Sequence, residues 1–468
     1  QRQEREVTLI HISAQYENND ADFQLICNLV LSEMQRVNVP GVAVGLLRDG
    51  REYLAGFGVT SVENPLPVTA DTLFQIGSTT KTITATIVMQ LGEKGLIDLD
   101  EPIRTYLPKL KLRDQSAVRT VTMRHLLTHQ GGWPGDYFRD TGNCDDALSR
   151  YVSEMAILPQ EVPVGTLWAY NNAGFGLAGR IIELITKQTY EEVAQELILD
   201  PLGMSNSFFF PADVISRRFV VGHRFDEDEG VIVERPWALA RSAHAVGGLC
   251  SSARDQLRYA RFSLGDGRTT GGQRLLEPAT MRAMQTPQFP ANYGRQQGLG
   301  WRLQDYGDAW AVLHGGATNG QESAFLMIPT RNFAITILTN AEEGTLLNET
   351  VVARALDHYL NLRQPVTTQV ELSAEAMREY EGTYEAQMTR LDLYQSEGKM
   401  MLQVTPKGGF PDVDSPPSPP PPPVRMAFIG PDLAMALDEP LNNLKAEFLR
   451  EDGRIVWLRT SRLHRRIN

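Results

Sequence analysis

The chain of 468 residues contains little cysteine and no long apolar run. Its three cysteines are odd in number and far apart, which argues against a disulfide framework and against a cysteine-based zinc site. The most apolar stretch, residues 174–185, is short and carries two charged residues, whereas a membrane-spanning helix needs about 20 apolar residues. We therefore expect neither a disulfide-stapled protein nor an integral membrane protein.

Positive charge is also in deficit. Lysine and arginine number 45 against 57 aspartate and glutamate residues, so the net charge is −12 with neutral histidines. Such a surface repels phosphate backbones and anionic lipid, and we expect neither nucleic acid nor a membrane as partner. The first residues, QRQEREVTL, lack the apolar core of a signal peptide, which leaves the compartment open with the cytoplasm favoured.

Strand patterns at both ends of the first 362 residues enclose a mostly helical middle. A hairpin with its turn at Asp49-Gly50 supplies strands near the start, and a meander supplies them near the end. We expect an α/β fold of the α+β type, with one antiparallel sheet flanked by helices plus an all-helical subdomain. The expected helices cover most of 1–40, then 78–91, 123–128, 146–156, 174–186, 253–262 and 346–360; the expected meander strands are 310–314, 323–328 and 333–338.

The pattern changes after residue 362. Residues 363–371 read as a polar, proline-containing linker, and residues 372–468 hold the short alternating segments typical of a small all-β barrel. The run SPPSPPPPPV at 415–424 favours polyproline II and cannot join a central strand. We expect two domains, 1–362 and 372–468.

Ser78 and Lys81 form S-x-x-K at the start of an expected helix, where three-residue spacing places both side chains on one face. A serine hydroxyl becomes nucleophilic when a base takes its proton, and a lysine can do so if burial and nearby positive charge lower its pKa. The alternative is an N-cap serine beside a surface lysine. A second S-x-x-K, Ser396–Lys399, fits a solvated hairpin tip.

Tyr170 and Asn172 form Y-x-N between a turn-rich loop and the start of a helix. A phenol near an ammonium group can relay protons, and an amide can hydrogen-bond a substrate carbonyl. The alternative is a packed tyrosine beside an asparagine that satisfies a turn. The same pattern at Tyr16–Asn18 and Tyr359–Asn361 looks incidental.

His314-Gly315-Gly316 lies on the first strand of the meander, which we expect to be an edge strand. Glycines weaken a strand unless a ligand or another backbone must approach closely, as on a substrate-binding edge. The N–H of Ala317 is then a candidate oxyanion donor beside that of Ser78. The alternative is an ordinary strand end followed by a glycine turn.

The other histidines fit structural roles better. His129-Gln130-Gly131 is a competing H-x-G, but it fits an ordinary helix end. Lone histidines are more often structural, and this group comprises His125, His223 and His244.

Taken together, these motifs resemble the serine β-lactamase and penicillin-binding protein superfamily. The likeness is greatest to the branch with class C β-lactamases, D-alanyl-D-alanine carboxypeptidases, D-aminopeptidases and esterases of β-lactamase fold. It covers roughly residues 20–360 and rests on VPGVAVGLLRDG, FQIGSTTKTITATIVMQLGEKG, TMRHLLTHQGG, YNNAGFGLAG, LDPLGM and AVGGLCSSARD. The C-terminal part resembles a lipocalin-like barrel appended to some members.

The resemblance implies a role for each matched residue. Ser78 would be the acylated nucleophile, Lys81 the proton acceptor, and Tyr170 the base that also protonates the leaving group. Asn172 would orient the substrate and Lys81. The strand residues His314, Gly315, Gly316 and Ala317 would bind the substrate, with Ser78 and Ala317 forming the oxyanion hole.

His314 stands where β-lactamases of this branch usually carry a lysine. A histidine with a pKa of about 6.5 is mostly neutral at pH 7, so strong carboxylate capture is not expected and β-lactamase activity loses weight. We expect a serine hydrolase without metal or organic cofactor, acting on a small-molecule ester, amide or short peptide. A peptidase or amidase, with D-amino acids an option, is narrowly preferred to a carboxylesterase; a weak β-lactamase and a non-catalytic penicillin-recognising module are further alternatives.

The barrel has two interpretations. We expect it to cap the cleft and limit substrate length, because it follows directly after the helix that closes the first unit. Homo-oligomerisation through an exposed strand edge is the alternative.

Overall fold

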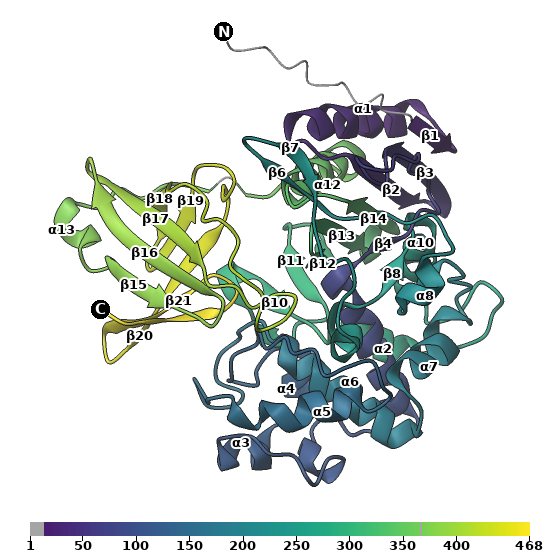
Figure 1. The fold of residues 1–468 in the computed structure, drawn as a ribbon, viewed down its shortest axis with the longest axis horizontal. Coiled ribbons are helices and arrows are strands. Elements are labelled where there is room, and N and C mark those ends of the chain that lie inside the picture. Colours follow the sequence, from purple (N-terminus) through teal and green to yellow (C-terminus); the bar gives the residue numbers. More distant parts are fainter. Residues whose placement is uncertain (1–13, 366) are drawn as a thin grey trace.

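The computed structural model describes residues 14–365 and 367–468. Its main feature is a nine-stranded antiparallel sheet with the order β1-β3-β2-β14-β13-β12-β11-β10-β9 (Figure 1). The strands, in chain order, are β1 (Ala14–Glu17), β2 (Gly41–Arg48), β3 (Arg51–Gly58), β9 (Phe289–Pro290), β10 (Gln296–Gln297), β11 (Arg302–Asp305), β12 (Trp310–Thr318), β13 (Gln321–Ile328) and β14 (Phe333–Thr339).

Helices cover both faces of this sheet, because its strands send alternate apolar side chains to opposite sides. On one face, α1 (Ala21–Arg36) and α12 (Gly344–Leu360) pack against residues such as Val44 and Ile335. On the other face, α10 (Ala253–Leu264) and the helical region share a second core, to which Ala43 and Leu338 contribute. The sheet is thus the middle layer of the fold, as Figure 1 shows.

The helical region is built around α2 (Thr80–Glu93), which is buried from Thr80 through Leu91. Its neighbours include α6 (Asn172–Thr186), whose N-cap Asn171 accepts from the Gly174 N–H. The remaining helices are α3 (Gln115–Thr120), α4 (Met123–Leu127), α5 (Ala147–Glu154), α7 (Tyr190–Ala194), α8 (Pro211–Val214), α9 (His244–Gly247) and α11 (Pro278–Met284). Two small sheets complete this region. One has three strands in the order β4 (Phe74–Gln75), β8 (Cys250–Ser251) and β5 (Ser207–Phe208), and the other pairs β6 (His223–Asp226) with β7 (Gly230–Val233).

After the short helix α13 (Ala374–Met377), the chain forms a closed eight-stranded antiparallel barrel. First and last strands pair at Tyr384 and Arg466, so the barrel has no open strand edge. The strands are β15 (Gly382–Glu385), β16 (Thr389–Ser396), β17 (Lys399–Pro406), β18 (Val424–Gly430), β19 (Leu433–Ala436), β20 (Lys445–Glu451), β21 (Arg454–Arg459) and β22 (Leu463–Arg466). This confirms the lipocalin-like barrel and removes the basis for oligomerisation through a free barrel edge.

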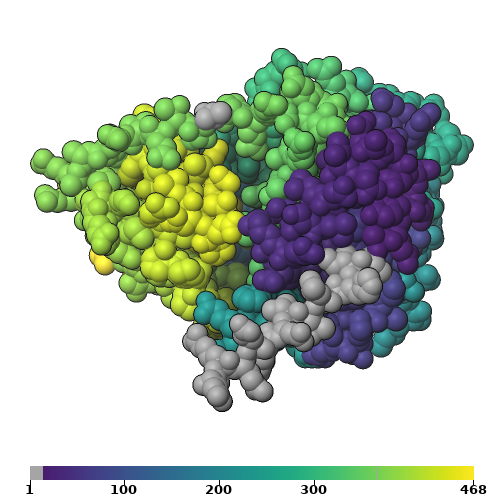
Figure 2. Space-filling view, turned by 90° about the horizontal axis from the view of Figure 1, so that it is seen from above, coloured from purple at the N-terminus to yellow at the C-terminus, as the bar shows by residue number. Residues whose placement is uncertain are grey.

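The barrel lies beside the rest of the chain in both views (Figure 1, Figure 2). In Figure 2 its yellow residues meet the purple N-terminal residues, where Arg36 Nη1 lies 2.7 Å from Glu439 Oε1. The proline run falls in the segment between β17 and β18, outside the strands, as expected.

Several sequence predictions hold and some do not. The expected α+β class and the hairpin are confirmed, with Asp49 and Gly50 both at positive φ in its turn. The expectation of helix over most of 1–40 is wrong at β1, which pairs with β3, and residues 1–13 lie outside the described part. Within the described ranges, no helix is long and apolar enough to cross a membrane.

The expected edge position of β12 is wrong for half the strand. Arg302–Asp305 of β11 pairs with Trp310–Leu313, and β10 and β9 extend the sheet further. These strands have only two to four residues, too few to show a period in the sequence. From His314 to Thr318, β12 runs beyond the end of β11, so this half has no β11 partner.

Candidate active site

Ser78 lies where the central helix meets the sheet. It belongs to the 3-10 helix Gly77–Thr79, which leads into α2, so the helix expected from residue 78 begins with a tighter turn. Ser78 is partly exposed, whereas Lys81 is fully buried. Residues 77–79 pack against the half of β12 that has no β11 partner.

Two glycines make this contact possible. A Cβ on Gly77 would lie 2.7 Å from the backbone nitrogen of Ala317, and Gly77 also has a φ of +50°. A Cβ on Gly316 would lie 2.6 Å from the Ser78 nitrogen and even closer to the Ile76 carbonyl oxygen. The close backbone approach expected from the glycines of β12 is present, and it brings the Ser78 and Ala317 backbones together.

Lys81 points its amine at the serine. Its Nζ lies 2.8 Å from Ser78 Oγ and 2.8 Å from the Val246 carbonyl oxygen, and no carboxylate of the described residues pairs with it. Burial lowers the pKa of Lys81 well below its usual value of 10.5; Arg462 and Arg302 lower it further, and Asp136 opposes them. A buried amine without a counter-ion is driven towards its neutral form, which can accept a proton.

Tyr170 lies in a cage of cationic and aromatic groups. Its ring centroid is 5.1 Å from Lys81 Nζ, 5.0 Å from Arg302 Cζ and 4.7 Å from Arg462 Cζ. Burial raises the pKa of the Tyr170 phenol, while Arg302, a hydrogen bond with the Ser78 side chain and Arg462 lower it. The structure therefore brings Ser78, Lys81 and Tyr170 into one cluster.

Asn172 is buried at the start of α6, but its hydrogen bond goes to a residue that the sequence analysis did not single out. Its Nδ2 donates to Asp136 Oδ1 at 2.8 Å, and the two hydrogen bonds of Lys81 go to Ser78 and Val246 instead. The suggestion that Asn172 orients Lys81 directly has no hydrogen bond to support it.

His314 is buried beside Tyr170, with ring centroids 6.2 Å apart. Its Nδ1 lies 2.6 Å from the Gly315 carbonyl oxygen, so this nitrogen carries the hydrogen and donates. Burial, then Arg302 and Lys81, lower the pKa of His314 well below its usual value. The histidine is neutral, as expected from the sequence.

His129 lies at the site, although its H-x-G pattern indicates an ordinary helix end. Its Nδ1 accepts from the Asn171 N–H at 3.0 Å, and its ring lies 4.4 Å from that of Tyr170. His129 follows the end of α4 in the chain, and its ring lines the site beside Tyr170. The three histidines expected to be structural bond elsewhere: His125 in the cap of α4, His223 with the Asn340 carbonyl oxygen and His244 with Glu191.

Arg302 supplies the cation that the sequence motif lacks. Its guanidinium lies over the rings of Trp168 and Tyr170, and burial lowers its pKa to about 10. Within the described residues it has neither an ion-pair nor a hydrogen-bond partner, and its Nε is buried. The expectation of weak carboxylate capture considered His314 alone, and Arg302 adds a cation near enough to lower the pKa of His314.

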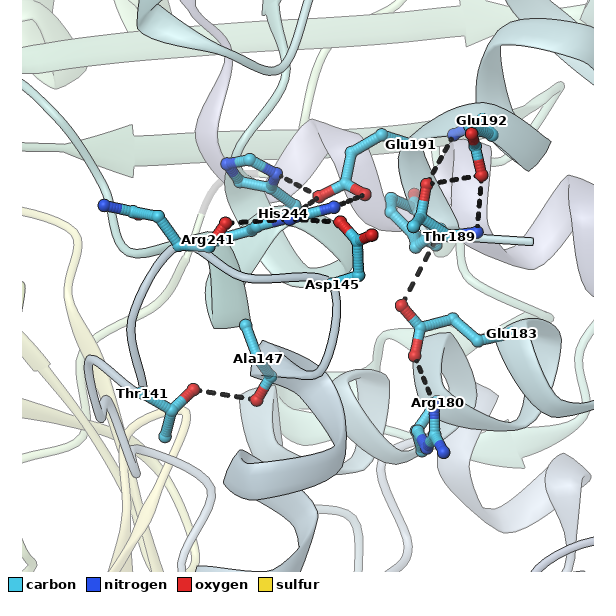
Figure 3. Close-up of polar contacts among 12 residues, drawn as sticks. Thr141, Asp145, Ala147, Arg180, Glu183, Thr189, Glu191, Glu192, Arg241 and His244 are labelled. Atoms are coloured by element: carbon cyan, nitrogen blue, oxygen red, sulfur yellow. Dashed lines mark hydrogen bonds and ion pairs between the residues drawn. The ribbon is translucent and has the colours of Figure 1, made fainter. Parts of the chain in front are cut away.

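A buried ion network holds the residues behind the site (Figure 3). Glu191 Oε1 lies 2.6 Å from His244 Nδ1 and 3.1 Å from Arg241 Nε. Burial opposes ionisation of Glu191, but hydrogen bonds from His244 and Arg241 outweigh it and lower its pKa to about 2. Since His244 begins α9, the network ties down the helix that presents the Val246 carbonyl oxygen to Lys81.

The competing S-x-x-K motif is a hairpin tip. Ser396 and Lys399 pair across the turn from β16 to β17, with Glu397 and Gly398 at positive φ. All four residues are exposed or partly exposed, so this motif has no buried amine. In the described part of the chain, no group of three His, Cys, Asp or Glu side chains is placed to hold a metal ion.

An antiparallel sheet with a helical subdomain, and an S-x-x-K serine where the two meet, define a β-lactamase-fold protein of the serine hydrolase class. Comparison with known families agrees: the Beta-lactamase family model matches residues 28–358. Penicillin-binding protein 4 of Amycolatopsis lactamdurans is 32% identical over 337 residues, which cover 70% of this chain and 88% of that protein. The chain belongs to the β-lactamase family.

Solved structures extend the likeness to the barrel. A crystal structure of SurE with D-Leu is 26% identical, with a TM-score of 0.73, and covers 96% of this chain and 100% of that chain. A β-lactamase/D-alanine carboxypeptidase from Pseudomonas syringae is 23% identical, with a TM-score of 0.62, and covers 74% and 100%. The second likeness is one of fold.

Proposed function

We propose that the protein is a serine hydrolase that forms an acyl-enzyme at Ser78, with small peptides or amides as substrates. One observation carries the proposal: the buried amine of Lys81 lies 2.8 Å from the Ser78 hydroxyl oxygen and has no counter-ion among the described residues. A neutral amine in that position can take the proton of the serine as its oxygen attacks.

The proposed reaction has two halves. In the first, Ser78 Oγ bonds to the substrate carbonyl carbon while its proton passes to Lys81 Nζ, and the N–H groups of Ser78 and Ala317 hold the oxyanion. The bond to the leaving nitrogen or oxygen then breaks, and that atom receives the proton through the Tyr170 hydroxyl. In the second half, water adds to the acyl carbon and gives its proton to the same groups. The bond between that carbon and Ser78 Oγ then breaks, Ser78 takes the proton, and the acid leaves.

Two solved structures and one wall of the site support short peptides or amides as the substrate class. The SurE structure was solved with D-Leu, and the Pseudomonas syringae protein is titled a D-alanine carboxypeptidase. Beside Tyr170, Arg302 is a cation without an acidic partner in the described part of the chain, which suits a peptide carboxylate. These points favour a peptidase or amidase for short peptides, including those with D-amino acids.

A carboxylesterase is the second candidate, and neutral His314 is the observation in its favour. The position that usually carries a lysine here carries no charge, so an uncharged ester meets no unsatisfied cation on β12 itself.

We further propose that residues 1–362 form the hydrolase domain and 372–468 the barrel domain, joined by 363–371. The bridge between Val370 and Phe428 of the barrel supports a boundary near the end of that linker.

A substrate panel tests the proposal. The wild-type protein and Ser78→Ala are assayed against D- and L-aminoacyl p-nitroanilides, short D- and L-peptides, p-nitrophenyl acetate and a chromogenic cephalosporin. We expect turnover of the amides or peptides by the wild type and none by Ser78→Ala. Faster turnover of the ester than of every amide would select the carboxylesterase.

Covalent labelling separates an enzyme from a binding module. A fluorophosphonate should label the wild type and not Ser78→Ala, with the adduct on the peptide that contains Ser78. Full activity in Ser78→Ala would refute the proposal. A stable fluorescent-penicillin adduct without turnover of any substrate would instead indicate a receptor.

A further inference from the structure

The C-terminal barrel reaches the catalytic cluster through the turn between β21 and β22. The backbone N–H of Tyr170 donates to the Ser461 carbonyl oxygen at 2.8 Å, across nearly 300 residues of sequence. Two flanking hydrogen bonds join Asn292 Nδ2 to the Thr460 carbonyl oxygen and Arg459 Nη1 to the Trp168 carbonyl oxygen. The barrel therefore binds the loop that carries Tyr170 at Trp168 and at Tyr170 itself, and it binds a second hydrolase segment at Asn292.

Arg462, next in this turn, makes a two-pronged ion pair inside the hydrolase domain. Its Nε lies 2.8 Å from Asp136 Oδ2 and its Nη2 lies 2.8 Å from Asp136 Oδ1. Asp136 Oδ1 also accepts from Asn172 Nδ2 at 2.8 Å. A chain of charged and amide groups thus runs from the barrel through Asp136 to the start of α6.

Packing holds this turn in place. An apolar cluster joins Val162 of the hydrolase domain to Trp457 and Leu463 of the barrel. A second barrel segment contacts the other side of the region: the Val413 N–H donates to the Phe138 carbonyl oxygen, two residues after Asp136. The approach of Arg462 is therefore part of a built interface and not a lone surface contact.

We propose that Arg462 is a positioning residue: by its paired hydrogen bonds to Asp136 it fixes the Asn172 amide and the Tyr170 ring, so that the barrel completes the active site. This inference rests on the proposed hydrolase function. Arg462 need not touch the substrate, because it acts through Asp136 and through its charge at the Tyr170 ring. A paired guanidinium suits this role, since its fork fixes the carboxylate in direction as well as distance.

The charges around Lys81 make the role measurable. Arg462 lowers the pKa of Lys81 and Asp136 raises it, both after the larger effect of burial. The other titratable or charged groups that face Lys81 are Arg302, Tyr170, His129 and His314. Those that face Asp136 are Tyr151, Glu161 and His464, of which His464 also faces Arg462. Removing Arg462 should raise the pKa of Lys81, and neutralising Asp136 should lower it.

The test compares kcat, KM and the pH profile of kcat/KM in Arg462→Ala, Arg462→Lys, Asp136→Asn and the double variant Asp136→Asn with Arg462→Ala. We expect Arg462→Ala to lower kcat about 100-fold with little change in KM, as a misplacement of about 1 Å does. The acid limb of the kcat/KM profile should move to higher pH in Arg462→Ala, because the pKa of Lys81 rises. It should move to lower pH in Asp136→Asn, because the pKa of Lys81 falls. Arg462→Lys should recover part of kcat, and the double variant should lose less than the two single losses combined.

Arg425→Ala is the matched control, because it removes a paired Arg–Asp contact with Asp438 within the barrel. It should leave kcat and the pH profile unchanged. Thermal melting and circular dichroism check each fold. If Arg462→Ala does not fold, Asp136→Asn still shifts the acid limb to lower pH, and Arg462→Lys, which keeps the charge, still shows whether kcat needs the paired hydrogen bonds.

Wild-type kcat and an unmoved pH profile in Arg462→Ala would overturn the proposal. An effect on KM alone, confined to substrates with a carboxylate, would also overturn it, because Arg462 would then bind the substrate. Fluorophosphonate labelling keeps the two proposals apart. Failure to label Ser78 in the wild type refutes the hydrolase, whereas equal labelling rates in wild type and Arg462→Ala refute the positioning role alone.

Discussion

Lys81 Nζ and the Val246 carbonyl oxygen are 2.8 Å apart, and this contact fixes the direction of the amine that faces Ser78. A carbonyl oxygen orients an amine without adding the negative charge that would hold the proton on it. Replacing this partner with a carboxylate would raise the pKa of Lys81, because an opposite charge favours the ammonium form. The choice of a backbone acceptor is thus consistent with a lysine that must give up its proton.

The first prediction concerns the amine itself. Lys81→Arg keeps a hydrogen-bonding cation but removes the base, because a guanidinium does not lose its proton in proteins. We expect kcat/KM to fall by about 10²–10⁴-fold, the range of general-base contributions. The measurement is turnover of the best substrate of the panel, with the melting temperature as the fold control. An activity within a few-fold of wild type would exclude Lys81 as the base.

The second prediction concerns stability. The pKa of Lys81 is lowered well below 10.5 in the folded protein, so between these two values the unfolded chain binds more protons and folding is penalised. Lys81→Met removes this penalty, and we expect it to melt higher than wild type by about 2 °C or more at pH 7. The gap should close above about pH 10.5, where both states of wild type are neutral at this residue. Melting curves of both proteins over a pH series measure this difference in melting temperature. A difference that does not change with pH would contradict the prediction.

The third prediction concerns the network of Figure 3. Glu191→Gln removes one of the two carboxylates that pair with buried Arg241 and leaves Asp145 as the other, so the loss should not exceed the about 3–5 kcal/mol of a fully broken buried pair. Since the folded pKa of Glu191 is lowered to about 2, its contribution is present above about pH 4.5 and is lost as the pH falls towards 2. Wild type should therefore lose stability over this range, and Glu191→Gln should lose less. Denaturant unfolding at a series of pH values measures both.

Glu192→Gln is the control for that experiment. Glu192 lies on the same helix and only caps its first turn through Thr189, a role that glutamine also performs. Glu192→Gln should lose stability with falling pH to the same extent as wild type. Equal losses in the two variants would show that the helix, and not the buried network, is what the substitution damages.

How much of this site the sequence predicts depends on how local its signals are. The clustering of Ser78, Lys81 and Tyr170 is visible in advance, because each lies in a short motif at a helix start or on a loop. The hairpin of β2 and β3 has a turn signal as well, and it is correct. The roles assigned to these residues stay predictions.

The rest has no local signal. Asp136 and Arg462 meet across 326 residues, and a lone aspartate or arginine shows no pattern in sequence. Arg302 lies on a four-residue strand whose period cannot be read, and β9 and β10 are shorter still. These residues become visible only when the tertiary fold brings distant segments together.

The fourth prediction concerns Arg302. An unpaired, half-buried guanidinium favours a negatively charged ligand, so Arg302→Gln should weaken the binding of substrates that carry a carboxylate. We expect KM for such a peptide to rise about 10-fold or more, the cost of about 1.4 kcal/mol or more in binding, and KM for p-nitrophenyl acetate to change little. For the carboxylate-bearing peptide, the KM of Arg302→Lys should lie between those of wild type and Arg302→Gln. Equal changes for charged and neutral substrates would mean that Arg302 supports the site and does not read the carboxylate.

The fifth prediction concerns Gly316. A Cβ there meets the Ile76 carbonyl oxygen and the Ser78 nitrogen, both backbone atoms that cannot rotate away, so Gly316→Ala must push the nucleophile turn from β12. We expect kcat/KM to fall by about 100-fold or more, because the shift moves Ser78 relative to Ala317. Gly92→Ala, on the same helix as Lys81 with only one contact at 3.5 Å, is the control and should not reduce activity. Gly315→Ala should lose less than Gly316→Ala, since its Cβ meets only the Ser323 carbonyl oxygen at 3.1 Å. The same order in kcat/KM and in fluorophosphonate labelling rate would place the damage at Ser78, whereas an active Gly316→Ala would mean that the turn and the strand can separate without loss.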